Sequence, residues 1–219
     1  MRRAVPGLLL VATAMLAASP FMIDAAPPEV TMGLVQKIFY VHLPSAMLFM
    51  VASVVCGTSS AIYLLGGRRL GADRAAFTAA ELAIVFGLIT LVTGPLWGRK
   101  AWGVWWVWDV RLTSTLVMWL LSWSYVLLRR FGGAGSETLS AGVGLFGMAL
   151  VPFVYWSVNV WRTLHPKTSV VPTLPASMGK PLWWSVAAFA CLFAVLFATR
   201  ARLERLRTDV DMALADADE

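Results

Sequence analysis

The sequence predicts an all-α membrane protein, a bundle of six transmembrane helices. Hydrophobic residues make up 59% of the 219 positions and charged residues only 14%. The mean hydropathy is +0.73, and such a composition is typical of a polytopic membrane protein. A helix needs about 20 mostly apolar residues to cross the hydrocarbon core of a bilayer, and no stretch alternates as a transmembrane β-strand would. The expected spans are residues 5–23, 44–65, 77–97, 112–128, 141–161 and 181–199.

The first expected span has two interpretations. It follows the basic start Met-Arg-Arg, and small residues follow at 17–26, so it also resembles a secretory signal peptide. Its apolar run is longer than a usual signal core, and five more spans follow. We therefore expect a retained helix, and cleavage would leave the topology of the later helices unchanged.

The later spans are separated by segments of two kinds. Loops 66–76 and 129–138 are short, basic and contain glycine, whereas the segments before the second span, before the fourth and before the sixth are longer and more varied. After the sixth span, residues 200–219 begin basic and end acidic. We expect mainly a solvated cytoplasmic tail there, with a short frayed helix as the alternative. The chain is expected to form a single domain, residues 1–219.

The basic residues predict that both termini lie in the cytoplasm. Eleven of the 18 Lys and Arg residues fall on the side of the termini and seven on the opposite side, and basic residues accumulate on the cytoplasmic side. Arginines at helix ends explain most of the net charge of +6, so no nucleic-acid partner is expected. The eleven are Arg2, Arg3, Arg68, Arg69, Arg74, Arg129, Arg130, Arg200, Arg202, Arg205 and Arg207, and the seven are Lys37, Arg99, Lys100, Arg111, Arg162, Lys167 and Lys180.

A tryptophan-rich segment lies on the outer side, between the third and fourth spans. It begins W-G-R-K-A-W-G-V-W-W-V-W-D and spans residues 97–111, and it holds five of the 11 tryptophans. Nine of the 11 fall on the outer side, whereas an interfacial belt would use both sides. At about 100° per residue, one face of a short helix along the membrane surface would carry Trp102, Trp105, Trp106 and Asp109. The residue types alone leave a membrane anchor and a platform for a flat ligand equally open. The candidate platform residues are Trp97, Trp102, Trp105, Trp106, Trp108 and Asp109.

The chain has only two histidines, and both are expected on this outer side. His42 lies one turn before the second span and His165 just after the fifth. A zinc site needs three or four ligands, which Asp109 or Glu29 could complete, but zinc has no use for large aromatic surfaces. Two imidazoles on opposite sides of haem iron fit better, with tryptophan faces covering the porphyrin. The candidates to meet the haem propionates are Arg99, Lys100, Arg162 and Lys167.

The pattern W-G-x-x-x-W-G-x-W-W-x-W-D, followed by x-R-L-T-S, resembles the tryptophan-rich (WWD) signature of haem-handling proteins in cytochrome c biogenesis. About six helices, with one histidine before the second and one after the fifth, look like the CcmC family over nearly the whole chain. The resemblance implies axial ligation by His42 and His165 and a haem platform over Trp97 to Asp109. Asp109 and Arg111 fall where the motif ends in charged residues tied to chaperone handling. One departure is Pro166, where relatives are expected to have Gln.

The resemblance also implies a function and partners. It implies a haem-binding and transfer protein, not an enzyme, in the bacterial inner membrane with periplasmic functional loops. Such a protein holds non-covalent, b-type haem and delivers it to the haem chaperone CcmE, helped by the small protein CcmD and the transporter pair CcmA and CcmB.

Two other functions remain as alternatives. A membrane electron-transfer protein would keep its haem, but two histidines on one side give electrons no route across the membrane. An unrelated small-solute transporter predicts paired intramembrane charges or broken helices, and the sequence suggests neither.

Overall fold

The computed structural model describes residues 4–217, and the elements among them are helical. Six helices are long and apolar enough to cross a membrane, which confirms the predicted fold class. Arg2 and Arg3 of the charge count, and residues 218–219 of the expected tail, lie outside the described residues. The elements in order are α1 (Ala4–Asp24), η1 (Leu34–Ile38), α2 (Phe39–Leu65), α3 (Leu70–Trp102), α4 (Val110–Phe131), α5 (Ser136–Val160), η2 (Thr168–Thr173) and α6 (Ala176–Ala217), where η marks a short 3-10 helix.

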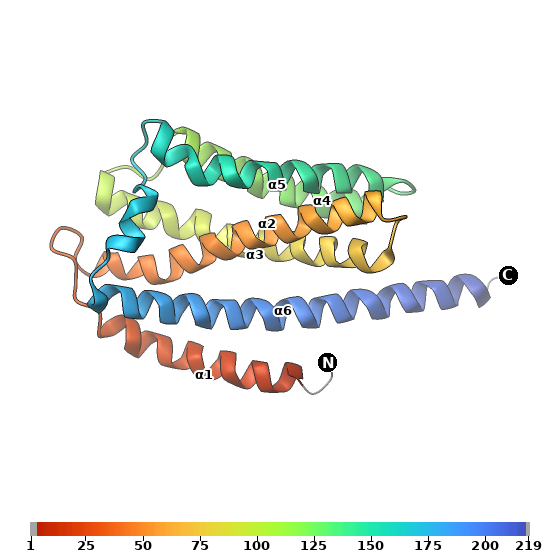
Figure 1. The fold of residues 1–219 in the computed structure, drawn as a ribbon, viewed down its shortest axis with the longest axis horizontal. Coiled ribbons are helices and arrows are strands. Elements are labelled where there is room, and N and C mark those ends of the chain that lie inside the picture. The colour runs from red at the N-terminus through yellow and green to blue at the C-terminus, as the bar shows by residue number, and fades with distance from the viewer. Residues whose placement is uncertain (1–3, 218–219) are drawn as a thin grey trace.

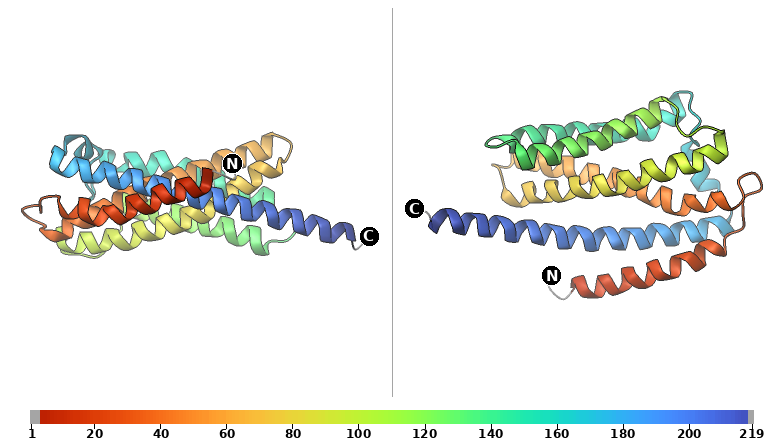
Figure 2. Two further views of the ribbon diagram at one scale, coloured as in Figure 1. Left: turned by 90° about the horizontal axis from the view of Figure 1, so that it is seen from below. Right: turned by 180° about the vertical axis from the view of Figure 1, so that it is seen from behind.

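Helices α2 to α5 form a four-helix body, and α6 packs on its α2 and α3 side (Figure 1). Helix α1 packs on the outer side of α6, away from the body (Figure 2). The start of α1 and the end of α6 lie at the same end of the bundle, together with turns 66–69 and 132–135. We call this the terminal end. The opposite end, which we call the site end, carries residues 25–38, the tryptophan segment (residues 97–111) and residues 161–175.

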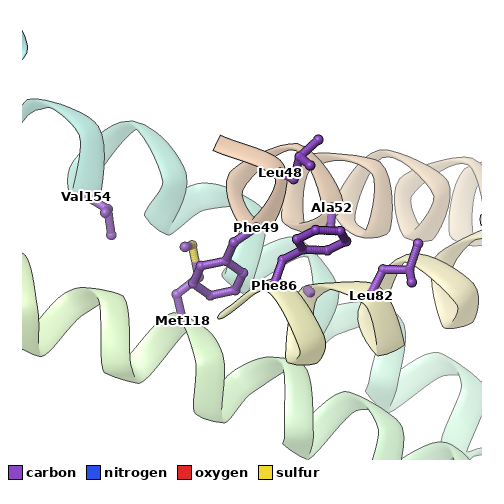
Figure 3. Close-up of a cluster of buried hydrophobic side chains, with 8 residues drawn as sticks. Leu48, Phe49, Ala52, Leu82, Phe86, Met118 and Val154 are labelled. Atoms are coloured by element: carbon purple, nitrogen blue, oxygen red, sulfur yellow. The ribbon is translucent and has the colours of Figure 1, made fainter. Parts of the chain in front are cut away.

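The core of the body is built from side chains of all four of its helices. Phe49 of α2, Phe86 of α3 and Met118 of α4 are each 1% exposed and pack together (Figure 3). Some polar side chains inside the bundle hydrogen-bond to their own helix: the Ser53 and Thr90 hydroxyls donate to the carbonyls of Phe49 and Phe86 at 3.0 and 2.8 Å. This pairing suits a chain in lipid, where an unsatisfied polar group is costly.

Ion pairs join three helices near the terminal end. Glu81 of α3 binds Arg130 of α4 at 2.8 Å and also contacts Arg200 of α6. About two turns of α3 closer to the terminal end, Arg129 binds Asp73. A charged group is stable within a membrane bundle only when it faces a partner or water, so these pairs fix how α6 sits against α3 and α4.

The helices extend beyond the expected spans, and in two of them, α2 and α6, the extension changes a prediction. Helix α2 begins at Phe39 rather than at residue 44, so His42 is part of the helix instead of preceding it. Pro44 is the sixth residue of α2, so its missing N–H removes the hydrogen bond that the Tyr40 carbonyl would accept. Helix α6 continues to Ala217, where we expected mainly a solvated tail. Residues 200–217 contain no Gly or Pro, and i,i+4 ion pairs such as Arg200–Glu204 at 2.9 Å support the helix.

Candidate functional site

The tryptophan segment is not the single surface helix that we expected. Helix α3 continues to Trp102 and ends at Gly103, which has a left-handed φ of 77°. Residues 104–109 are irregular, and Asp109 then caps the start of α4, accepting a hydrogen bond from the Leu112 backbone N–H at 2.8 Å. A left-handed glycine stops a helix and an N-cap aspartate starts one. The predicted common helical face of Trp102, Trp105, Trp106 and Asp109 is therefore wrong.

The first two tryptophans of the segment lie on the last turns of α3 and form an edge-to-face pair. The ring centroids of Trp97 and Trp102 are 5.3 Å apart, with an angle of 86° between the planes. The Trp97 indole N–H also donates to the Gln36 side chain of η1 at 3.3 Å. This pair therefore joins α3 to the chain that leads into α2, in addition to any contact with a ligand.

The other three tryptophans lie on the irregular part of the segment. Trp106 and Trp108 form a second edge-to-face pair, with centroids 5.7 Å apart. Trp105 and Trp108 are 58% and 76% exposed, so they offer open aromatic surface. The Trp106 indole nitrogen is buried and has no hydrogen-bond partner among residues 4–217. Buried donors are nearly always paired, so this N–H is a candidate to bind an acceptor from outside the chain.

His42 lies near the start of α2, and Thr93 of α3 fixes the protonation of its ring. The ring Nδ1 is 2.9 Å from the Thr93 hydroxyl oxygen. That hydroxyl donates its one hydrogen to the Ile89 carbonyl at 2.6 Å, so its oxygen must accept from Nδ1–H. The Nε2 of a neutral ring then carries a free lone pair, the form that binds a metal. Helix α3 passes close by, since a Cβ on Gly94 would lie 3.2 Å from the His42 Cε1.

His165 lies in the irregular segment after α5 and reaches the same state by a different contact. Its Nδ1 is 2.9 Å from the Pro166 carbonyl oxygen, which can only accept, so Nδ1 carries the proton and Nε2 a lone pair. Burial, helped by the positive charge of Arg111, lowers the pKa of His165 to about 4. The ring is therefore neutral at neutral pH.

Asp109 connects the tryptophan segment to the segment that holds His165. Besides capping α4, its carboxylate accepts a hydrogen bond from the Thr163 hydroxyl. The same Thr163 oxygen accepts from the His165 backbone N–H at 3.1 Å. The sequence had marked Asp109 as a platform residue, whereas Thr93 and Thr163 had been missed. Thr163 could have been noticed from its place two residues before His165, but nothing in the sequence marks Thr93.

Arg111, in the first turn of α4, contacts α5. Its guanidinium donates to the backbone carbonyls of Val154 and Tyr155, and its positive charge acts on both His42 and His165. The structure thus brings His42, His165, Asp109 and Arg111 to one place at the site end.

The other predicted basic residues lie at the site end, but in the described part of the chain no hydrogen bond joins them to His42, His165 or Asp109. The Arg99 guanidinium donates to the Gly103 carbonyl and so helps to close the end of α3. Lys100 and Arg162 are exposed at the site end, and Lys167 precedes η2. Their contact with propionates stays a prediction.

A zinc site is not formed by the described residues. Within 4–217, no three His, Cys, Asp or Glu side chains come together as a metal-binding group. The Glu29 carboxylate accepts from the backbone N–H groups of Thr31 and Met32 at 2.8 and 2.7 Å, and both Asp109 oxygens are also engaged. Two neutral imidazoles, at the end of the bundle that also carries exposed indoles and an unpartnered indole N–H, are side chains that could hold a haem iron.

Comparison with known proteins identifies the family of the chain. The model of the family described as "Heme exporter protein C" (CcmC) matches residues 1–215. Heme exporter protein C of Bradyrhizobium diazoefficiens is 34% identical over 214 residues, covering 95% of this chain and 81% of the relative. The Escherichia coli K12 protein of the same name is 34% identical over 184 residues, 81% of this chain and 73% of the relative. A putative cytochrome c biosynthesis ccmC-like mitochondrial protein of Marchantia polymorpha is 33% identical over 180 residues, 81% of this chain and 77% of the relative. The chain belongs to the heme exporter protein C family.

Proposed function

We propose that this protein binds haem at its site end, through the Nε2 atoms of His42 and His165, and delivers it to the haem chaperone CcmE during cytochrome c maturation. One observation carries the proposal. The only two histidines of the chain meet at one end of the bundle, and each has its Nδ1 engaged so that Nε2 is free. Relatives named heme exporter protein C and a relative named for cytochrome c biosynthesis support haem as the cargo.

The surrounding residues are suited to hold haem without a covalent bond, as a b-type group. The indole faces of Trp105 and Trp108 are exposed and can lie against the porphyrin. The unpartnered Trp106 N–H can donate to a propionate, and Lys100 and Arg162 supply positive charge nearby. The exposure of Trp105 and Trp108 also lets a partner reach a cargo held there, which a transfer protein requires. Bond formation on the chaperone would then be chemistry of the chaperone, assisted by this protein.

The cellular setting follows from the charge distribution and the family. The excess of arginines at the terminal end favours a cytoplasmic location for both termini and a periplasmic location for the site end, in the bacterial inner membrane. The expected partners are CcmE at the site end, CcmD, and the transporter pair CcmA and CcmB. Electron transfer finds less support, because two histidines at one end offer a place for only one haem.

The proposal is tested by absorption spectroscopy of the purified protein. We expect a Soret band in the wild type that shifts or is lost in His42→Ala and in His165→Ala, because each variant removes one axial ligand. Cys191→Ala removes a half-buried thiol that could otherwise bind iron, and it serves as the control with an unchanged band. An unchanged Soret band in both histidine variants would exclude these ligands.

A second measurement tests delivery. When CcmE is coexpressed, we expect haem-loaded chaperone to copurify with the wild type and less of it with either histidine variant. Haem that stays on this protein in the presence of CcmE would instead favour a permanently bound electron-transfer group.

A further inference from the structure

Each histidine of the site is supported by one threonine from another position in the chain. Thr93 accepts from the His42 ring at 2.9 Å, across the interface between α2 and α3. Thr163 accepts from the His165 backbone N–H at 3.1 Å and donates to the Asp109 carboxylate. Both hydroxyls therefore use their donor and their acceptor at once, so neither rotates freely.

We infer that Thr93 and Thr163 are positioning residues for His42 and His165, and that Asp109 acts on His165 through Thr163. The inference rests on the proposed function, in which Nε2 of each ring binds iron. Groups behind a metal-binding histidine fix its tautomer and the direction of its ring, and their loss weakens metal binding by about 10- to 100-fold. The hydrogen bonds themselves belong to the haem-free protein, so they can be tested apart from haem.

The two threonines hold different parts of their histidines: Thr93 contacts the His42 ring, whereas Thr163 contacts the His165 backbone. His42 is part of α2, so loss of the Thr93 hydroxyl would free the ring while the backbone stays in the helix. His165 lies in irregular chain between α5 and η2, and the Thr163–Asp109 contact ties this backbone to the start of α4. Loss of that contact would free the backbone and the ring together. We therefore expect His165 to depend more strongly on its support than His42 does.

The first test uses the haem-free protein labelled with ¹⁵N only in histidine. Two rings give four nitrogen signals, and protonated and unprotonated ring nitrogens are well separated. We expect both wild-type rings to carry the proton on Nδ1. Thr163→Val should shift the His165 pair towards an average of the two tautomers and leave the His42 pair in place, and Thr93→Val should do the reverse. His165 signals that stay unchanged in Thr163→Val would overturn the inference.

The second test measures haem binding. We expect Thr163→Val and Asp109→Asn to bind haem about 10- to 100-fold more weakly, with a spectrum in which the His165 ligand is missing. Added imidazole should restore the six-coordinate spectrum, since it replaces a misplaced ligand but would not repair a misfolded protein. Asparagine caps helices about as well as aspartate, so Asp109→Asn leaves the start of α4 intact.

Matched variants keep the test interpretable. Thr163→Ser retains the hydroxyl and should behave as the wild type. Thr173→Val removes an exposed hydroxyl that bonds only to the carbonyls of Ser169 and Val170, so it should leave both the signals and the affinity unchanged. Shifted His165 signals in haem-free Thr163→Val, combined with an unaltered Soret band in His165→Ala, would support the hydrogen-bond inference while overturning the proposed function. Wild-type affinity in Thr163→Val would overturn the inference.

Discussion

The position of one proton decides which nitrogen of a neutral histidine can bind a metal. In this chain the two protons are placed by unrelated partners, a threonine hydroxyl for His42 and a backbone carbonyl for His165. The result is the same in both rings, because Nε2 is left with its lone pair. Two different hydrogen bonds thus leave the same nitrogen, Nε2, free in both histidines, as a site with two equivalent histidine ligands requires.

Trp106 differs from the other tryptophans of its segment because its buried N–H has no acceptor among the described residues. If a haem propionate accepts this hydrogen bond, Trp106→Phe should weaken haem binding while the aromatic ring is retained. A hydrogen bond to a charged group contributes about 1.5–3 kcal/mol, so we expect at least a roughly tenfold loss of affinity, measured by titrating haem and following the Soret band. The band position should not change, since the axial ligands remain.

Trp123→Phe is the control for this variant. Trp123 lies on α4 outside the tryptophan segment and is 39% exposed, so its replacement should change haem affinity little. Equal affinities of wild type and Trp106→Phe would show that the indole N–H finds no acceptor on the ligand.

At the level of elements, the six membrane helices were predictable from composition because a span needs only length and apolarity. The tryptophan segment was not, because its periodicity was interpreted as if the chain stayed helical. Gly103 and Asp109 carried the contrary signal: a glycine and an aspartate six residues apart are typical of a helix end followed by a helix start. The two histidines were found because they are the only ones. Thr93 was missed because it becomes His42's neighbour only through the packing of α2 on α3.

The close packing of α2 on α5 requires a residue without a side chain at position 57, and this can be tested. A Cβ at this position would lie 2.3 Å from the Met148 Cβ and 3.0 Å from the Gly144 carbonyl oxygen, so Gly57→Ala must push the two helices apart. Overpacking of this kind costs about 1–3 kcal/mol. We expect a lower Tm in thermal unfolding of the detergent-solubilised protein.

Gly147→Ala is the matched control, since a Cβ on this α5 glycine meets no atom within 4 Å. It should leave the Tm unchanged or raise it slightly, because alanine favours a helix over glycine by up to about 1 kcal/mol. A Tm equal to that of the wild type in Gly57→Ala would mean that α2 and α5 pack less closely than the structure has them.

For the whole molecule, the arrangement separates two kinds of chemistry along the bundle axis. Arginine–carboxylate pairs join α3, α4 and α6 towards the terminal end, whereas the histidines and the tryptophan segment gather at the site end. Because α1 packs on α6 rather than on the body, the site is built almost entirely from α2 to α5 and the segments that join them. The four-helix body thus holds Thr93 directly, and it holds Thr163 through Asp109 at the start of α4.

Because the histidines lie at only one end of the bundle, delivery of haem to a periplasmic chaperone depends on which end faces the periplasm. Thr31 is exposed at the site end and Ala134 is exposed in the turn between α4 and α5 at the terminal end. In a chain whose Cys56 and Cys191 have been replaced by Ala, we expect Thr31→Cys to react with a membrane-impermeant maleimide in intact spheroplasts. Ala134→Cys should react only after the membrane is permeabilised, because the arginine-rich end faces the cytoplasm. The opposite labelling pattern would place His42 and His165 on the cytoplasmic side, where this protein could not hand haem to a periplasmic chaperone.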